Sequence, residues 1–109
     1  MKLNIYDKKR IVKTYEAETY DLMWGTVEDI TEALKLDEMK TGNKDEIVKM
    51  AVTLVVEAKS TVNDLIKDIF EGITDEELRN TRVAEIASVL VDVVMYTLKE
   101  LNKGSKEKN

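Results

Sequence analysis

Acidic side chains are the residues of this sequence whose type and spacing could support chemistry. Glu28, Asp29 and Glu32 fall close together on one predicted helix, and Glu85 and Asp92 share a face of a later one. Residues three or four positions apart lie on the same side of a helix. Carboxylate oxygens are hard ligands that can share a divalent cation such as Mg²⁺. The spacing therefore raises the question of a magnesium site built from two helices.

All-helical nucleotide pyrophosphohydrolases bind magnesium through an EExxE motif on one helix and an ExxD motif on a later helix. The run from Glu28 to Glu32 reads EDITE, a loose match to the first motif. The run from Glu85 to Ser88 reads EIAS, so the second motif lacks its essential acid. Charge of this density is also ordinary on the solvated faces of amphipathic helices. We favour that interpretation and expect Glu28, Glu32, Glu85 and Asp92 not to assemble a magnesium site.

Composition removes most other catalytic chemistries. The 109 residues include no cysteine and no histidine. Disulfides, zinc sites of the Cys/His kind, Cys or Ser-His nucleophiles and haem held by histidine are therefore excluded. The sequence also has no phosphate-binding loop, no GxGxxG motif and no nucleophile elbow. We expect a protein that is not an enzyme and that uses no catalytic residue, metal or cofactor.

The charge distribution argues against nucleic acid as a partner. The net charge is −5, whereas phosphate binding needs clustered Lys and Arg. The sign is uneven: residues 1–20 carry five basic and three acidic groups, and residues 21–109 carry twelve and nineteen. No stretch approaches the ~20 apolar residues of a membrane span, and the N-terminus does not resemble a signal peptide. We expect a cytoplasmic protein without a membrane partner.

The first 18 residues have the residue pattern of a β-hairpin. Leu3 and Ile5 alternate with polar residues, and a second run rich in β-branched and aromatic residues includes Ile11 and Tyr15. This period of two on both sides of a polar tip predicts two antiparallel strands. Such a hairpin is marginal alone and must pack on the helices that follow. Its basic tip, residues 8–10, either contacts an acidic partner or is a solvated turn.

Residues 19–103 are predicted to be helical, because the chain has no proline and only four glycines. A first helix begins at Thr19 or Thr26, and residues 37–42 form a loop. Asn43 caps a second helix, which continues to residue 69. Gly72 ends it, and Thr74 opens a short helix to about residue 80. A last helix spans 81–102, before a disordered polar tail at 104–109.

The expected fold is therefore mainly α: a small helical bundle with an N-terminal β-hairpin, forming a single domain over residues 1–103. The last helix is apolar around most of its circumference, which suggests two buried faces. We assign one set of residues to the core: Val83, Ala87, Leu90, Val94 and Leu98. The other set is the candidate contact surface for self-association or for a helical partner: Val89, Val93 and Tyr96.

A second candidate interaction patch contains Trp24, Met23 and Phe70. Large apolar side chains near a turn can serve a partner, because aromatic residues contribute strongly to binding. They can equally cover the junction between the hairpin and the helices, since large side chains usually serve the core. The sequence leaves both interpretations open.

Two residue runs resemble a known family. The run Arg10–Asp29 reads RIVKTYEAETYDLMWGTVED, and the run Lys67–Leu78 reads KDIFEGITDEEL. Both closely resemble tail assembly chaperones of long-tailed phages and prophages of Gram-positive bacteria. The family more usually has Phe where this chain has Trp24, which keeps the aromatic character.

The resemblance implies a non-enzymatic role like that of the lambda-type tail chaperones. Such a protein coats the tape-measure protein and recruits tail-tube subunits in the host cytoplasm, and it is absent from the mature virion. The family also makes a longer form by ribosomal frameshifting. The resemblance supplies no binding residues. A plain structural oligomerisation module and a pyrophosphohydrolase with a degenerate metal site are the alternatives.

Overall fold

The computed structural model describes residues 1–34 and 43–107, so the loop predicted at 37–42 lies outside the described residues. The chain folds as predicted, into a mainly helical domain with an N-terminal β-hairpin. Its elements in chain order are β1 (Lys2–Asp7), β2 (Arg10–Glu16), the 3-10 helix η1 (Thr19–Asp21), α1 (Trp24–Leu34), α2 (Lys44–Glu57), α3 (Lys59–Ile69), α4 (Asp75–Arg79) and α5 (Val83–Glu107).

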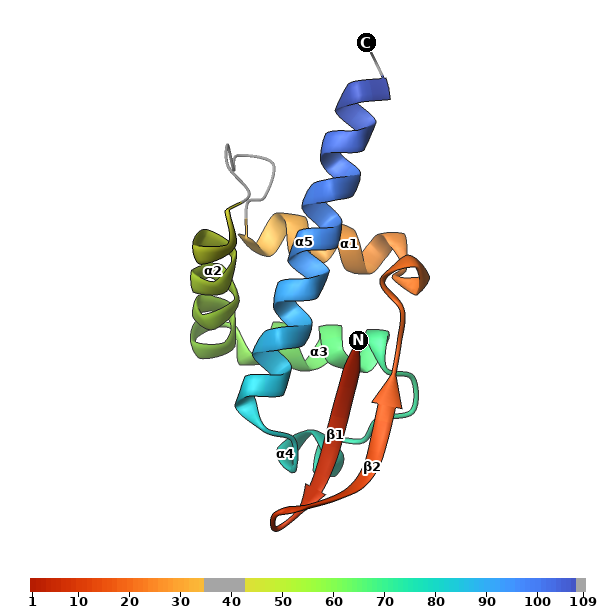
Figure 1. Cartoon of the computed structure of the whole chain (residues 1–109), viewed down its shortest axis with the longest axis vertical. Helices are drawn as coiled ribbons and strands as arrows, with labels where there is room; N and C mark the ends of the chain where they lie inside the picture. Colours follow the sequence, from red (N-terminus) through yellow and green to blue (C-terminus); the bar gives the residue numbers. More distant parts are fainter. Residues whose placement is uncertain (35–42, 108–109) are drawn as a thin grey trace.

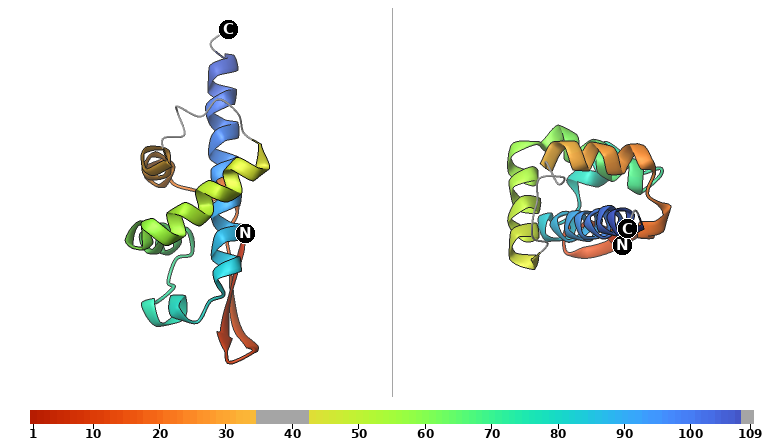
Figure 2. Two further views of the ribbon diagram at one scale, coloured as in Figure 1. Left: turned by 90° about the vertical axis from the view of Figure 1, so that its left-hand side faces the viewer. Right: turned by 90° about the horizontal axis from the view of Figure 1, so that it is seen from above.

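The helix α5 runs along the long axis of the molecule, and the other elements pack around its N-terminal half (Figure 1). The helices α1 and α3 lie roughly across α5 as one layer, and the hairpin lies on the other side (Figure 2). The helix α2 closes one end of this arrangement and makes the most extensive helix contact with α5. No helix of the described part is long and apolar enough to cross a membrane.

The hairpin is antiparallel, with Leu3 opposite Tyr15 and Ile5 opposite Lys13. Leu3 and Ile5 are buried, as their alternation with polar residues predicts. The turn is short, and Lys8 takes a left-handed conformation with φ 61°. The register shifts after Ile5, and Val12 is the extra residue of the resulting β-bulge.

The core lies where the hairpin, α1, α2, α3 and α5 meet. Its largest fully buried apolar side chains come from every layer: Leu3, Ile30, Ile47, Leu65, Ile66, Phe70, Val89, Leu90, Val93 and Val94. Thr97 is buried among them, and its hydroxyl donates to the carbonyl oxygen of Val93 at 2.8 Å. This bond satisfies a polar group that would be costly to bury alone.

Two predicted helix caps are confirmed. The side chain of Asn43 accepts a hydrogen bond from the backbone N–H of Glu46 at 2.9 Å. Thr74 and Glu77 form a reciprocal capping box at the start of α4. Gly72 has φ +91° in the turn that follows α3, a conformation that glycine adopts without a side-chain clash.

Other helix boundaries differ from the prediction. The predicted helix from 43 to 69 is broken at Ala58, whose backbone (φ −132°, ψ 52°) is not helical. The break redirects α3, so that its buried face can reach the core under α1 (Figure 1). The helix α1 begins at Trp24, which is neither of the two predicted positions. Thr19 instead begins η1, and Thr26 is buried inside the first turn of α1.

The helix α5 begins and ends later than the predicted range of 81–102. It continues to Glu107, so residues 104–107 of the predicted polar tail belong to the helix. Residues 108–109 lie outside the described residues.

Candidate protein-binding surfaces

The predicted contact face of α5 is wrong for two of its three residues. Val89 and Val93 are 2% and 0% exposed, and Tyr96 is half-buried. Val83, which was assigned to the core, is 67% exposed instead. The buried stripe joins Val89 and Val93 to Leu90 and Val94, so the core lies between the two predicted faces. Periodicity identified the apolar arc but not which part of it points inward.

The two large aromatic residues predicted as an interaction patch are separated by the fold. Phe70 is 1% exposed and contributes to the core, whereas Trp24 is 69% exposed. Met23 and Tyr20 are similarly exposed beside Trp24 in the sequence. We call Tyr20, Met23 and Trp24 the aromatic patch. Sequence reasoning missed Tyr20, although three large side chains within five residues were a usable signal.

Local structure explains why the aromatic patch faces outward. The 3-10 turn of η1 ends at Asp21, and Leu22 then packs against the core. The first turn of α1 directs Thr26 and Val27 inward, where both are buried. Trp24 lies two positions before Thr26, on roughly the opposite side of the helix, and its side chain is exposed. Isolated exposed apolar residues are ordinary on proteins, but three large exposed side chains within five residues make this segment a candidate interaction site.

A second exposed apolar surface lies on α2. Ile47, Ala51 and Leu54 form the buried face of this helix. The outer face carries the valine stripe, which we define as Val48, Val52 and Val56. These residues recur every four positions, so they follow one side of the helix. This spacing is visible in the sequence, but Val48 and Val52 directly follow core residues of the same helix. The sequence pattern therefore identified only the core face of α2.

The two surfaces lie on opposite sides of the molecule. The start of α1 lies at the right of the view in Figure 1, and α2 lies at its left. The view from above shows the same separation (Figure 2). The aromatic patch and the valine stripe therefore belong to elements that are well separated in the fold.

Glu85, a candidate metal ligand in the sequence, instead joins α5 to the hairpin. Its Oε1 accepts the backbone N–H of Asn4 at 2.9 Å, and its Oε2 accepts the hydroxyl of Tyr6. The hydrogen bond to the Glu85 carboxylate raises the pKa of Tyr6. Arg82 stacks over the Tyr6 ring at 4.3 Å from its centroid. This carboxylate is thus engaged in holding β1 against α5.

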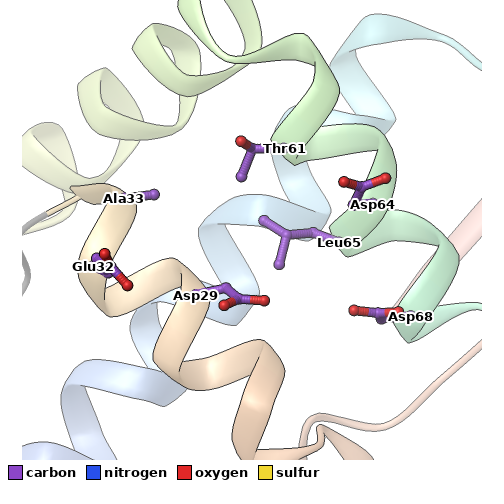
Figure 3. A pocket seen from close by; sticks show the side chains of 7 residues that line it. All are labelled: Asp29, Glu32, Ala33, Thr61, Asp64, Leu65 and Asp68. Carbon is purple, nitrogen blue, oxygen red and sulfur yellow. The ribbon is translucent and has the colours of Figure 1, made fainter.

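Four other carboxylates line a pocket of about 350 Å³ between α1 and α3. Asp29 of α1 and Asp68 of α3 point toward one another across it (Figure 3). The remaining lining residues are Glu32, Ala33, Thr61, Asp64 and Leu65. Glu85, the acid of the second motif, does not line this pocket. Within residues 1–34 and 43–107, no three acidic side chains form a group that could hold a metal ion.

Comparison with known proteins adds no relative. No protein-family model matches the chain, and neither a curated protein nor a solved structure is significantly similar to it. The case for function therefore rests on the residues and surfaces described above.

Proposed function

We propose that this protein is a non-enzymatic tail assembly chaperone of a phage or prophage. It binds the tape-measure protein and helps to recruit tail-tube subunits in the bacterial host cytoplasm, and it leaves before the virion matures. The observation that carries the proposal is the run Arg10–Asp29, which resembles the opening of such chaperones. The second run, Lys67–Leu78, extends that resemblance into the α3–α4 region.

The aromatic patch supports the proposal, because it lies at the C-terminal end of the first run. A tape-measure protein is a long helical chain with exposed apolar seams, and a chaperone for it needs an apolar surface. Trp and Tyr are the side chains that most often contribute binding energy at protein interfaces. Met adapts its shape to irregular apolar partners. We assign the aromatic patch to the tape-measure protein, with Trp24 as its central contact.

The valine stripe gives the chaperone a second apolar surface. A helix with an apolar stripe packs against the apolar face of another element. Because the stripe lies on the opposite side from the aromatic patch, its occupant does not compete with the tape-measure protein. We assign the valine stripe to the tail-tube subunit.

The roles of the acidic residues favour this proposal over a pyrophosphohydrolase. Glu85 accepts hydrogen bonds from Asn4 and Tyr6, and it does not line the pocket that the other acids form between α1 and α3. Ser88 replaces the acid of the second motif. A pyrophosphohydrolase needs carboxylates from both motifs around one cation, and the described residues do not provide that arrangement.

Co-expression tests the proposal. The gene immediately downstream is expected to encode a very long tape-measure protein. Expressed alone, that protein should aggregate, because its apolar seams are uncovered. Co-expressed with this chain, it should remain soluble and co-purify with it. A tape-measure protein that stays equally insoluble would contradict the proposal. Self-association without any effect on the tape-measure protein would favour the oligomerisation module.

A further inference from the structure

The aromatic patch lies in a stretch of the chain that carries only negative charge. Residues 14–34 contain no basic residue, although the chain has 17 Lys and Arg. Their acidic residues are all exposed: Glu16, Glu18, Asp21, Glu28, Asp29 and Glu32. Glu16 pairs with Lys2, and no ion pair between described side chains engages the others. The aromatic patch is therefore flanked on both sides in the sequence by negative charge that no described basic side chain neutralises.

One row of side chains connects the aromatic patch to the acidic pocket between α1 and α3. We call Trp24, Glu28 and Glu32 the α1 row, because they recur every four positions along the exposed side of this helix. Glu32 also lines the pocket. It lies eight positions after Trp24, which corresponds to a rise of about 12 Å along the helix. A partner that contacts both ends of the row therefore follows α1 for little more than two turns.

The pocket offers a basic side chain both opposite charge and an apolar wall. Its lining contains four carboxylates and no basic residue, together with Ala33 and Leu65. Asp29 and Asp68 point toward one another across it (Figure 3). Lys and Arg lay a hydrocarbon stem along apolar surface and keep the charged head among polar groups. The lining is therefore complementary to a Lys or Arg of a partner, whereas its carboxylates repel an acidic side chain.

The surface of α1 favours a helical partner over an extended one. Beyond the first turn, the backbone N–H groups of α1 are bonded within the helix, so α1 has no open edge to offer to a strand. An extended segment lying on α1 would gain no backbone hydrogen bonds, whereas a helix satisfies its own backbone groups. An amphipathic helix docks through apolar side chains that are spaced three or four residues apart.

We propose that the aromatic patch and the acidic pocket together bind a basic amphipathic helix that runs along α1. Apolar side chains of that helix cover Trp24 and Met23, and a Lys or Arg about two turns away enters the pocket beside Glu32. The negative charge steers this partner and rejects acidic helices. The inference rests on the proposed function for its natural partner. It specifies which part of the tape-measure protein binds, namely an apolar helix seam flanked by basic residues.

Fluorescence of Trp24, the sole tryptophan, tests the proposal at the patch itself. Its ring is 69% exposed, so its emission should move to shorter wavelength when a partner covers it. The probes are two helical peptides of roughly 20 residues without tryptophan. One is built from Leu, Ala and Lys, and the other has Glu in place of every Lys. The Lys peptide should shift the emission and shield the ring from acrylamide, and the Glu peptide should do neither. No shift with the Lys peptide, or an equal shift with the Glu peptide, would overturn the proposal.

A pair of charge variants separates the α1 row from the general negative charge of the protein. Glu28→Lys/Glu32→Lys reverses the charge of the row. Glu57→Lys/Glu76→Lys changes the net charge equally, at exposed positions outside α1 and the pocket. The first variant should bind the Lys peptide about tenfold or more weakly, because like charges then face each other, and the second should bind it nearly as the wild type does. Equal losses would overturn the proposed site. An emission shift on concentrating the chain alone would assign the patch to a second copy and would also overturn it.

Co-expression with the tape-measure protein separates this inference from the proposed function. The wild type and Glu57→Lys/Glu76→Lys should retain the tape-measure protein, and Glu28→Lys/Glu32→Lys should lose it. If both variants retain it, the chaperone proposal stands and the basic helix is wrong. If the wild type binds the Lys peptide but not the tape-measure protein, the chaperone proposal alone is wrong.

Discussion

The hydroxyl of Tyr15 donates a hydrogen bond to Oε1 of Glu77 at 2.7 Å and joins β2 to α4 across 62 residues of sequence. The same oxygen accepts the backbone N–H of Thr74 at 3.0 Å, as part of the capping box. Lys13 lies 3.4 Å from the other carboxylate oxygen. One carboxylate therefore caps α4 and anchors the hairpin to it. This link holds β2 at a fixed place on the helical body.

Removal of the Tyr15 hydroxyl should destabilise the domain. Tyr15→Phe retains the half-buried ring but loses a hydrogen bond to a charged acceptor, which is worth roughly 1.5–3 kcal/mol. Tyr15→Ala should cost more, because it also removes the ring. Urea unfolding measures both effects. Thr14→Val, which loses an exposed side-chain bond on the neighbouring residue, is the control and should cost less. Equal losses for Tyr15→Phe and Thr14→Val would contradict the role of this link.

The stability of the domain should depend on the protonation of Glu77. Hydrogen bonds from Tyr15 and Thr74, followed by the charge of Lys13, hold the pKa of Glu77 below its ordinary value of 4.5. A carboxylate with a lowered pKa contributes its stabilisation in full above the unfolded-state value. That contribution is lost as the pH falls from about 4.5 through the lowered value in the folded state.

Unfolding experiments on Glu77→Gln check this dependence. The variant should be less stable than the wild type at pH 7, and the difference should shrink as the pH falls below about 4.5. Glu76→Gln, an exposed neighbour on α4, is the matched control and should show a smaller change with pH. A stability difference for Glu77→Gln that is constant from pH 7 to pH 3 would argue against the lowered pKa.

Two valine substitutions distinguish the core of α5 from the outer face of α2. Val93 is 0% exposed, and Val93→Asp should unfold the domain because it buries an unpaired charge. Val52 is 49% exposed, and Val52→Asp should leave the fold intact. Circular dichroism and thermal melting report both outcomes. A folded Val93→Asp would restore the surface role first expected for that residue.

Magnesium chemistry should be absent. Calorimetry with Mg²⁺ should show no specific binding, and pyrophosphate release from the common nucleotides should not exceed the rate without protein. Glu85→Gln should lower stability instead, because Glu85 accepts bonds from Asn4 and Tyr6. Turnover that disappears in Glu85→Gln would establish the pyrophosphohydrolase in place of the chaperone.

Local signals predicted the parts of this fold that depend on neighbouring residues. The strand alternation around Leu3 and Ile5, the cap at Asn43 and the capping box at Thr74 act within a few positions, and all three are present. Near the break at Ala58 the sequence offers only Ser60 and Thr61 as a possible kink, and the apolar periodicity runs through the region without proline or glycine. The break depends on how α3 must cross beneath α1, which is a tertiary property.

The binding surfaces were harder to predict than the fold. Val89 and Val93 have the same residue type and periodicity as exposed valines on α2, and only packing distinguishes them. Trp24 was predicted as a contact residue, and its side chain is exposed, but its binding role remains a prediction. Glu85 and Glu77 could not be identified as hairpin anchors, because their partners lie 81, 79 and 62 residues away.

The most direct test of the chaperone proposal is the affinity of purified Trp24→Ala for the tape-measure protein. Trp24 is exposed, so the variant should keep the melting temperature of the wild type. Loss of a central aromatic contact should weaken binding by at least about tenfold. Val83→Ala, at an equally exposed apolar residue outside the aromatic patch, is the control and should bind like the wild type. A Trp24→Ala variant that binds as tightly as Val83→Ala would contradict the account.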